Sequence, residues 1–146
     1  MFDNLTTTRL GYYVYALINP INDKPFYIGK GKDNRVFAHK EEVLSNNDNT
    51  INSLKAHEIV SILRSGLDIK HIIIRHSLTE NESFLIESTL IDFVNFFDKK
   101  LTNIVSGHDS NFYGIKTTNE IMRQYNAPKL EVLLHEVIII NINKKY

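Results

Sequence analysis

The sequence predicts an α/β fold of the α+β kind, in which a β-hairpin and a further strand combine with several helices and a C-terminal strand is added. Two runs rich in aromatic and branched residues, 12–18 and 26–28, are separated by a loop with two prolines, a pattern typical of a β-hairpin. A third run of branched residues covers 69–74. Two Thr-x-x-Glu capping boxes, at 79–82 and 117–120, predict the starts of two helices.

The first half of the chain places loops and helices around this hairpin. We expect residues 1–10 to be a short polar lead-in. Gly29 and Gly31 follow the second strand, where they let the backbone approach a ligand closely or take a positive φ. Asp33 is placed to cap a helix over 34–44. This half is completed by a polar loop over 45–50 and a helix over 51–64 that Gly66 ends.

The second half is mostly helical, with a β-forming end. The two capping boxes open a long helix to Phe97 and a shorter helix through Gln124. Between them, 101–114 is expected to be an irregular connection rich in hydrogen-bonding groups. Residues 132–142 favour a strand that joins the sheet or packs beside it. Because no repeat, linker or low-complexity segment is visible, we expect 1–146 to form a single domain.

Composition and charge restrict the class of protein. With 42% hydrophobic and 23% charged residues, the chain is typical of a soluble globular protein. No apolar run approaches the roughly 20 residues that a membrane helix needs, so no membrane partner is expected. The lack of cysteine and of a secretion signal predicts an intracellular, cytoplasmic location, in the nucleoid or nucleus if the target is DNA. The formal net charge of zero argues against tight nonspecific binding to duplex DNA.

A local surplus of positive charge surrounds the second strand of the hairpin. Lysines and arginines in this stretch outnumber the single acidic residue between them, and such a surplus suits an anionic substrate. Lys30 and Lys32, interleaved with Gly29 and Gly31, are therefore candidate substrate-binding residues. The residue types alone leave an alternative open, in which a half-buried hairpin is followed by an ordinary solvated helix.

The long helix after residue 79 contains one acidic residue that is out of place. At about 100° per residue, Glu87 projects into an apolar stripe, between Ile91 and Val94. A carboxylate that faces a core is costly unless it is paired or binds a cation. Two interpretations follow. Glu87 forms a buried salt bridge with Arg35 or a lysine, or it is a ligand for a divalent ion. Mg²⁺ suits a single carboxylate because it keeps several waters when bound.

Arg35 and His39 form a second candidate pair. They are four residues apart on the helix predicted over 34–44 and therefore share one face. An arginine there can bind a phosphate through two parallel hydrogen bonds. A histidine at helix spacing is by default a surface residue, but its place beside Arg35, after a Gly-Lys-Gly bend, favours a functional pair.

The order of these residues resembles the GIY-YIG endonuclease superfamily. The matching positions run in sequence from Tyr13-Val-Tyr15 and Tyr27-Ile-Gly29 to Arg35, His39, Glu87 and Asn103. Tyr13 departs from the family, which usually has Gly there, whereas Tyr15 fills the functional tyrosine position. The chain is most similar to the nuclease domain of LEM-domain, ankyrin-repeat type endonucleases, over nearly its whole length.

This resemblance implies a small central antiparallel sheet of three strands flanked by helices, and metal-dependent endonuclease cleavage of one DNA strand. By this resemblance Glu87 holds a single Mg²⁺ or Mn²⁺ on the scissile phosphate. Tyr15 orients and deprotonates the attacking water. Lys30 lies nearby to lower the pKa of the phenol, since a tyrosine at its usual pKa of about 10 is a poor base at neutral pH.

The other family positions have supporting roles in this hypothesis. Tyr27 hydrogen-bonds the phosphate or the nucleophile, and Arg35 neutralises the charge that develops in the transition state. His39 assists proton transfer or binds phosphate. Asn103 fixes the hairpin or the groups bound to the metal.

The neutral charge also bears on substrates and partners. It favours branched or distorted DNA, or help from a homodimer or a partner chain. Zinc ligands, a basic tail and a separate recognition helix are not visible in the sequence, so sequence-specific cutting is not expected. Two alternatives stay open: a catalytically silent domain that binds nucleic acid or protein, and a phosphodiesterase that cleaves RNA.

Overall fold

The computed structural model describes residues 1–146 except 46–52, 98–100, 104–106, 108 and 127–146. The chain divides into two compact units, Met1–Ile115 and Lys116–Tyr146. The first unit contains a three-stranded antiparallel sheet with helices, which confirms the predicted α+β class. The strand expected over 132–142 lies outside the described residues, and the single domain stays a prediction.

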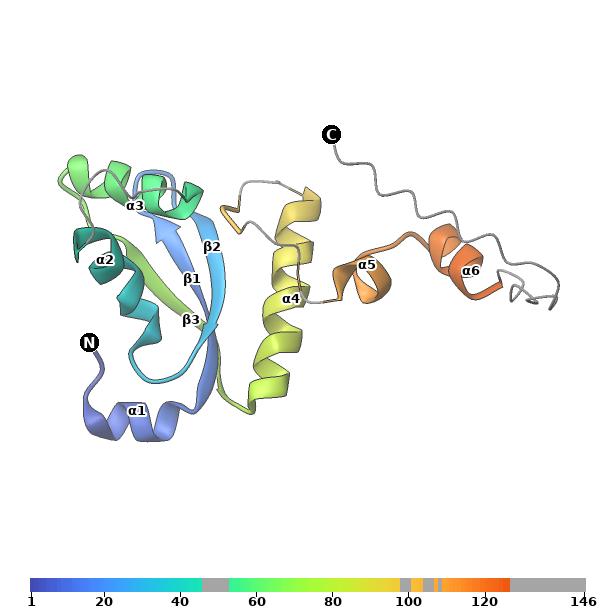
Figure 1. The fold of residues 1–146 in the computed structure, drawn as a ribbon, viewed down its shortest axis with the longest axis horizontal. Helices are drawn as coiled ribbons and strands as arrows, with labels where there is room; N and C mark the ends of the chain where they lie inside the picture. Colours follow the sequence, from blue (N-terminus) through green and yellow to red (C-terminus); the bar gives the residue numbers. More distant parts are fainter. Residues whose placement is uncertain (46–52, 98–100, 104–106, 108, 127–146) are drawn as a thin grey trace, which may run out of the picture. The chain divides into compact units, whose positions relative to one another are not determined.

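The sheet has the strand order β2-β1-β3, and both pairs are antiparallel. β1 (Tyr12–Asn19) is the central strand and is almost entirely buried, between β2 (Lys24–Gly31) and β3 (Lys70–Leu78) (Figure 1). β2 and β3 are longer than predicted. β2 continues through Pro25 because it is an edge strand, where a missing backbone N–H is tolerated.

A register shift in the hairpin turns two neighbouring aromatic side chains toward the same face. Leu17 pairs with Tyr27, but the next residue, Ile18, pairs with Pro25, so Phe26 is the extra residue of a β-bulge. Phe26 and Tyr27 consequently both pack into the same hydrophobic cluster. In a regular strand these two neighbours would point to opposite faces.

Alternating residues of β1 supply two separate hydrophobic cores. Helices α2 (Arg35–Ser45) and α3 (Leu54–Arg64) cover one face of the sheet, and α4 (Glu80–Phe97) packs on β1 and β2 at the other. The α2–α3 face buries Tyr13, Tyr15 and Leu17 from β1 with Val36, Ile59 and Ile62 from the helices. The α4 face buries Val14, Ala16 and Ile18 from β1 with Ile28, Ile91 and Leu101. Each such side chain contributes roughly 1.5–3 kcal/mol on burial.

Two helices were not predicted. Residues expected to be a lead-in contain α1 (Asn4–Leu10), whose N-cap Asp3 accepts a hydrogen bond from the Thr6 N–H at 2.7 Å. The connection expected to be irregular contains α5 (Ser110–Tyr113). Both helices are short and have no buried residue, so apolar periodicity could not reveal them.

One predicted helix start and one predicted helix cap need correction. α3 begins at Leu54 because the Ser53 hydroxyl caps it, accepting from the Ala56 N–H at 3.2 Å, whereas the sequence placed the start at residue 51. α2 begins at Arg35, and Asp33 has a φ of 53° instead of the extended backbone of an ordinary N-cap.

The hydroxyl of Tyr13, and not the carboxylate of Asp33, forms the hydrogen bonds at the start of α2. Its hydroxyl donates to the Asp33 carbonyl at 2.9 Å and accepts from the Val36 N–H at 3.1 Å. The central strand therefore fixes the start of α2. Asn34 joins the start of α2 to the N-terminal segment, because its side chain accepts from the N–H of Phe2 and donates to the C=O of Phe2.

Both capping boxes are confirmed. Thr79 and Glu82 bond each other reciprocally at the start of α4. In the second unit, Thr117 and Glu120 do the same at the start of α6 (Thr118–Asn126). None of the described helices combines the length and apolar content needed to cross a membrane.

Candidate active site

The hairpin brings Tyr15 and Tyr27 together over a glycine. Tyr15 on β1 pairs with Gly29 on β2, and the rings of Tyr15 and Tyr27 are 6.3 Å apart. A Cβ atom at Gly29 would lie 2.8 Å from the Tyr15 hydroxyl and 2.8 Å from Cε1 of Tyr27. Glycine is therefore required here because the two phenols occupy the space of a side chain.

Gly31 has a similar function for the next pair of side chains. A Cβ atom there would lie 2.9 Å from Cβ of Arg35 and 3.1 Å from the Tyr13 ring. Neither Gly29 nor Gly31 is among the described residues with positive φ, so the second of the two alternatives expected for these glycines is wrong. Both glycines are buried, and the close approach they permit is to side chains of this chain. Contact with a substrate at these glycines stays a prediction.

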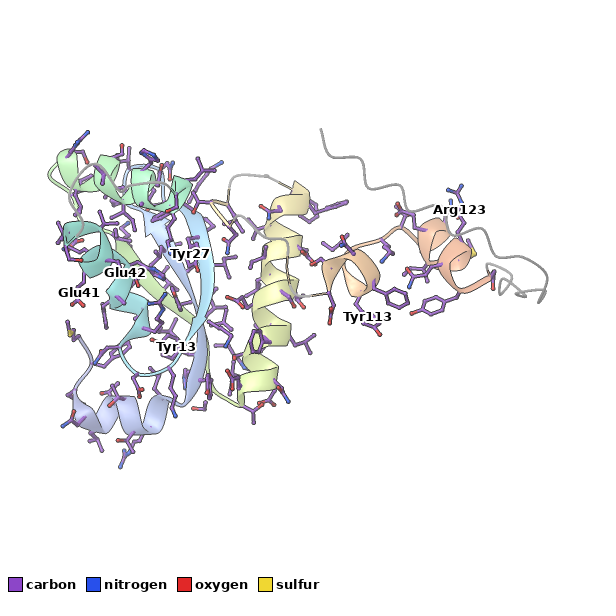
Figure 2. All side chains as sticks on the ribbon, viewed as in Figure 1. Tyr13, Tyr27, Glu41, Glu42, Tyr113 and Arg123 are labelled. Carbon is purple, nitrogen blue, oxygen red and sulfur yellow. The ribbon has the colours of Figure 1, made fainter. Side chains whose placement is uncertain are left out.

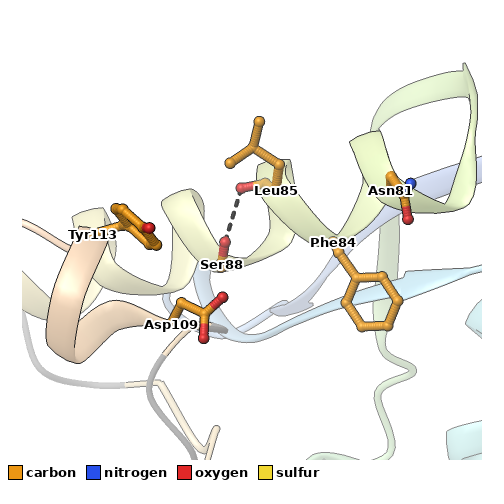
Figure 3. Close-up of a pocket in the computed structure, with 6 residues that line it drawn as sticks. All are labelled: Asn81, Phe84, Leu85, Ser88, Asp109 and Tyr113. Atoms are coloured by element: carbon orange, nitrogen blue, oxygen red, sulfur yellow. Dashed lines mark hydrogen bonds between the residues drawn. The ribbon is translucent and has the colours of Figure 1, made fainter.

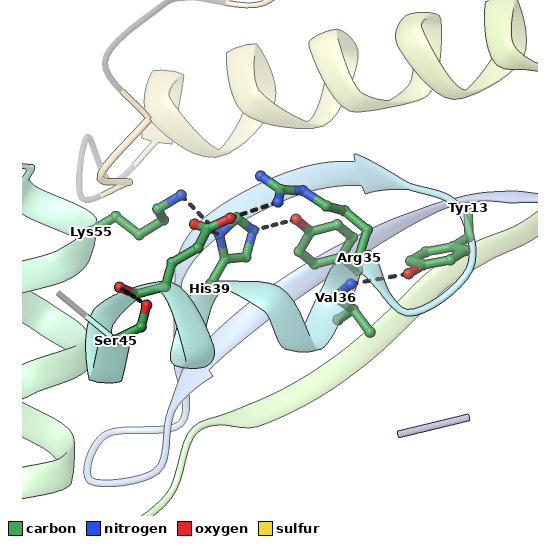
Figure 4. Close-up of polar contacts among 8 residues, drawn as sticks. Tyr13, Arg35, Val36, His39, Ser45 and Lys55 are labelled. Carbon is green, nitrogen blue, oxygen red and sulfur yellow. Dashed lines mark hydrogen bonds and ion pairs between the residues drawn. The ribbon is translucent and has the colours of Figure 1, made fainter. Parts of the chain in front are cut away.

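Helix α2 places His39 directly against Tyr15. The Tyr15 hydroxyl and His39 Nε2 are 2.5 Å apart, and only 1% of His39 is exposed. Figure 4 shows His39 on α2, with the side chains of Lys55 and Arg35 near it. His39 is therefore not at the surface, as a lone histidine at helix spacing would be by default, and its functional pairing with Arg35 stays a prediction. Its ring also packs against Tyr27 in a T-shaped arrangement, with ring centres 5.1 Å apart. Both hairpin phenols thus contact the same imidazole.

Two charged residues that the sequence analysis missed surround the other nitrogen of this ring. Lys55 Nζ lies 2.9 Å from His39 Nδ1, and Glu42 Oε2 lies 3.5 Å from it. Glu42 also binds the guanidinium of Arg35 at 2.7 Å. Figure 2 shows α2 carrying Glu42 and the sheet carrying Tyr13 and Tyr27. The spacing of Glu42 from His39, three residues on one helix, could have found it, but Lys55 on α3 has no local sequence signal.

Burial dominates the electrostatics of the two phenols and the imidazole. It raises the pKa of Tyr15 and that of Tyr27, and the positive charge of Arg35 opposes both shifts. Burial, followed by the charges of Lys55 and Arg35, lowers the pKa of His39 to about 4. At neutral pH the ring is therefore uncharged, with one protonated nitrogen and one lone pair.

Lys30 does not lie where the hypothesis for Tyr15 placed it. Its ammonium is 3.3 Å from Glu80 and 3.7 Å from the centre of the Phe84 ring. The cation that lowers the pKa of Tyr15 is Arg35. Lys32 is exposed, and its ammonium lies 5.5 Å from the Tyr12 ring centre. Binding of an anionic substrate by Lys30 and Lys32 stays a prediction.

Glu87 on α4 is anchored at the outer edge of β2. Its Oε1 accepts from the backbone N–H of Lys30 at 2.9 Å. In the part of the chain that the structure describes, Glu87 forms no salt bridge with Arg35 or with a lysine, so the first interpretation of this residue is not supported. Burial raises the pKa of Glu87, and the Lys30 hydrogen bond and charge oppose the shift. The negative charge of Glu87 raises the pKa of both Tyr15 and Tyr27, which places all three groups within electrostatic reach.

Asn103 and its neighbour Thr102 complete the same edge. The Asn103 side chain accepts from the Ile28 N–H at 3.1 Å and donates to the Ile28 carbonyl at 2.7 Å. The Thr102 N–H donates to the Phe26 carbonyl at 2.7 Å. An edge strand would otherwise expose these groups. Of the two roles expected for Asn103, this geometry supports the fixing of the hairpin.

The donor set around Glu87 fits a hydrated divalent ion and does not form a protein cage. Among the described residues there is no group of three His, Asp or Glu side chains that could hold a metal. One carboxylate oxygen of Glu87 is taken by a backbone N–H, and the other accepts no hydrogen bond from the described residues. A single hard oxygen ligand with water and phosphate in the remaining positions is a known arrangement for Mg²⁺.

A separate pocket lies on α4, away from this cluster. It has a volume of about 510 Å³ and contains none of the predicted site residues; it is lined by Asn81, Phe84, Leu85, Ser88, Asp109 and Tyr113 (Figure 3). One of its lining residues, Phe84, contacts the ammonium of Lys30. The pocket therefore does not define the candidate active site.

The comparisons with known proteins agree with this geometry. The sequence model of the LEM-3-like GIY-YIG domain matches residues 12–141, a stretch that includes every residue of the cluster. Searches of curated proteins and of solved structures gave no match. A family match over most of the sequence, together with the two tyrosines, the arginine and the glutamate around one hairpin, decides the assignment. The chain belongs to the family of LEM-3-like GIY-YIG domains, a family of nuclease domains.

Proposed function

We propose that this protein is a metal-dependent DNA endonuclease that hydrolyses a phosphodiester bond. The observation that carries the proposal is the geometry at β2: Glu87 accepts from the Lys30 N–H at 2.9 Å, one residue along the strand from Gly29, over which Tyr15 and Tyr27 meet. The carboxylate of Glu87 on α4 and the guanidinium of Arg35 on α2 both act on Tyr15 and Tyr27, although the two helices belong to opposite faces of the sheet. A carboxylate that could bind a metal ion, a guanidinium that could bind a phosphate, and two phenols are thus close to the same part of the hairpin.

Each of these residues has a distinct task in the proposed reaction. Glu87 would hold Mg²⁺ or Mn²⁺, which supplies positive charge for the scissile phosphate and offsets the carboxylate charge that raises the phenol pKa values. Tyr15 would accept the proton of the attacking water, and Arg35 would neutralise charge on the phosphate in the transition state. Tyr27 would orient the phosphate or the nucleophile.

Tyr15 cannot act as a base in its resting state, because burial keeps the phenol protonated at neutral pH. Before it can accept the proton of the attacking water, the Tyr15 hydroxyl must transfer its own proton to a solvent water, and donors and cations would stabilise the negative oxygen that results. The Arg35 charge supplies one such contribution, and His39, at 2.5 Å from the hydroxyl, is placed to supply another. We therefore assign His39 to the support of Tyr15 and not to direct phosphate binding.

Branched or distorted DNA is the substrate that we propose. The formal net charge is zero, so affinity for a long regular duplex must come from the local strip with Lys30, Lys32 and Arg35. A distorted site offers several phosphates to one short strip. A second copy of the chain in a homodimer, or a partner chain, would add further positive charge beside this strip.

The proposal is tested with Glu87→Gln and Arg35→Ala proteins on a panel of single-stranded, duplex, flap and four-way DNA and matching RNA, with Mg²⁺ or Mn²⁺. We expect each variant to lose about 10²-fold or more in cleavage rate, as for removal of a group that stabilises a transition state. Glu41→Gln and Arg9→Ala, which change exposed residues of the same types, serve as matched controls. Cleavage by both site variants at the wild-type rate would contradict the proposal, and preference for RNA would redirect it.

A further inference from the structure

We propose that Lys55 is a positioning residue of this site: by donating a hydrogen bond to Nδ1 of His39, it places the single ring proton on Nε2, which then donates to the phenol oxygen of Tyr15. The inference rests on the proposed nuclease function for its consequence, but the proton arrangement can be measured without any nuclease assay.

The position of Lys55 is unusual for a lysine. It is the second residue of α3, and a positive charge in the first turn opposes the helix dipole. The side chain is half-buried and not extended into solvent, with its ammonium 2.9 Å from His39 Nδ1 and 4.6 Å from the centre of the Tyr27 ring. Burial lowers the pKa of this ammonium, which means that the charged side chain has lost favourable hydration that it would keep at the surface.

The contacts around His39 determine which nitrogen carries the proton. An ammonium has three donors and no acceptor, so a hydrogen bond from Lys55 requires a lone pair on Nδ1. A neutral imidazole with its lone pair on Nδ1 has its proton on Nε2. The 2.5 Å contact between Nε2 and the Tyr15 hydroxyl is then a hydrogen bond that the ring donates and the phenol oxygen accepts.

Glu42 favours the opposite arrangement but is less well placed to impose it. A carboxylate would require a proton on Nδ1, and Glu42 Oε2 lies 3.5 Å from that nitrogen, against 2.9 Å for Lys55. The Glu42 carboxylate is also engaged by Arg35 at 2.7 Å. The shorter contact therefore decides in favour of the proton on Nε2.

The nitrogen that carries the His39 ring proton determines which hydrogen bond Tyr15 forms. With the proton on Nε2, His39 stabilises negative charge on the phenol oxygen, and the hydroxyl proton of Tyr15 is directed away from the ring. With the proton on Nδ1, Nε2 would instead accept the Tyr15 proton, and the phenol oxygen would lose its donor. Lys55 thus sets the direction of the Tyr15–His39 hydrogen bond.

The test is nitrogen NMR of protein labelled with ¹⁵N in its histidine rings, with the His39 signals assigned from a His39→Gln protein. We expect a neutral ring with the proton on Nε2 in the wild type and in Lys55→Arg, which keeps a donor. We expect a large fraction of the Nδ1-protonated form in Lys55→Met, whereas Lys70→Met, at an exposed lysine on β3, leaves the signals unchanged. A wild-type ring protonated on Nδ1, or a Lys55→Met ring identical to the wild type, would overturn the inference.

A kinetic measurement separates this inference from the proposed function. On the best DNA substrate, we expect Lys55→Met to lower kcat at least tenfold with KM nearly unchanged, and Lys55→Arg to restore most of it. If the wild type cuts DNA and Lys55→Met cuts it at the same kcat, the positioning role is refuted while the nuclease proposal stands. If the wild type cuts no nucleic acid but its ring protonation follows Lys55, the nuclease proposal fails while the ring assignment stands.

Discussion

Glu87 and Lys30 are 57 residues apart in the sequence, and the carboxylate of Glu87 accepts a hydrogen bond from the backbone N–H of Lys30 at 2.9 Å. The bond joins α4 to the edge of β2, next to the strand residues that carry the candidate active site. The same carboxylate is the proposed metal ligand. Glu87 therefore has a structural role and a chemical role, and suitable substitutions can separate them.

Glu87→Gln keeps an oxygen that can accept from Lys30, whereas Glu87→Leu leaves that N–H without a partner. We expect Glu87→Gln to change the free energy of unfolding by less than about 1 kcal/mol and Glu87→Leu to lower it by about 1–3 kcal/mol. Urea unfolding followed by circular dichroism checks this. Both variants should be inactive. Equal loss of stability in the two would show that the charge of Glu87, and not its hydrogen bond, holds α4.

Asn103→Ala should weaken the edge of β2, because it removes a donor and an acceptor from Ile28. We expect a loss of about 1–3 kcal/mol in the free energy of unfolding. Faster amide hydrogen exchange should be confined to the Ile28 N–H and its β2 neighbours. Asn22→Ala, in the exposed turn of the hairpin, is the control. Unchanged exchange at Ile28 would mean that Asn103 does not hold the strand.

The sequence predicted the elements whose signals are local. The hairpin was visible from two runs rich in aromatic and branched residues on either side of a proline-containing loop, and α4 and α6 were visible from reciprocal Thr–Glu caps. The inward direction of Glu87 followed from helical periodicity. In each case the informative residues are within a few positions of each other.

Features that depend on distant contacts were missed. The cap of α2 is supplied by Tyr13, twenty residues before Asp33. Lys55 approaches His39 only because α3 packs beside α2. The ammonium of Lys30 turns toward Glu80 on α4, fifty residues away. No spacing rule within one helix or strand could have predicted these contacts, because each depends on how elements pack.

Removal of the charge of Glu42 should strengthen DNA binding. Glu42 and Arg35 are each 47% exposed and form an ion pair that a phosphate must compete with. We expect Glu42→Gln to change stability by less than about 1 kcal/mol, as for other exposed pairs. We expect it to tighten the Kd for DNA by about threefold to tenfold, with the gain larger at low salt.

Fluorescence anisotropy with labelled four-way DNA measures this effect, in a Glu87→Gln background that prevents cleavage. Glu41→Gln is the matched control, since Glu41 is an exposed neighbour on the same helix. A control that tightens binding as much as Glu42→Gln would assign the gain to net charge and not to the release of Arg35.

His39 makes the stability of the fold sensitive to acid. Its pKa falls from the usual 6.5 to about 4, through burial first and then the charges of Lys55 and Arg35, with Glu42 opposing the shift. The uncharged rings of Tyr15 and Tyr27 face it from the sheet. Above pH 6.5 the imidazole is neutral in the folded and the unfolded chain.

Between pH about 6.5 and about 4 the unfolded chain binds a proton at His39 that the folded protein does not. The free energy of unfolding should therefore fall as the pH decreases through this window, by as much as ~1.4 kcal/mol per pH unit from this residue. His39→Gln removes the titrating group and should flatten the dependence, whereas His57→Gln, at an exposed position of α3, should retain it. Urea unfolding of the three proteins between pH 4 and 8 gives the comparison. A constant stability difference between wild type and His39→Gln across that range would show that His39 titrates alike in both states, and would remove it as the source of acid sensitivity.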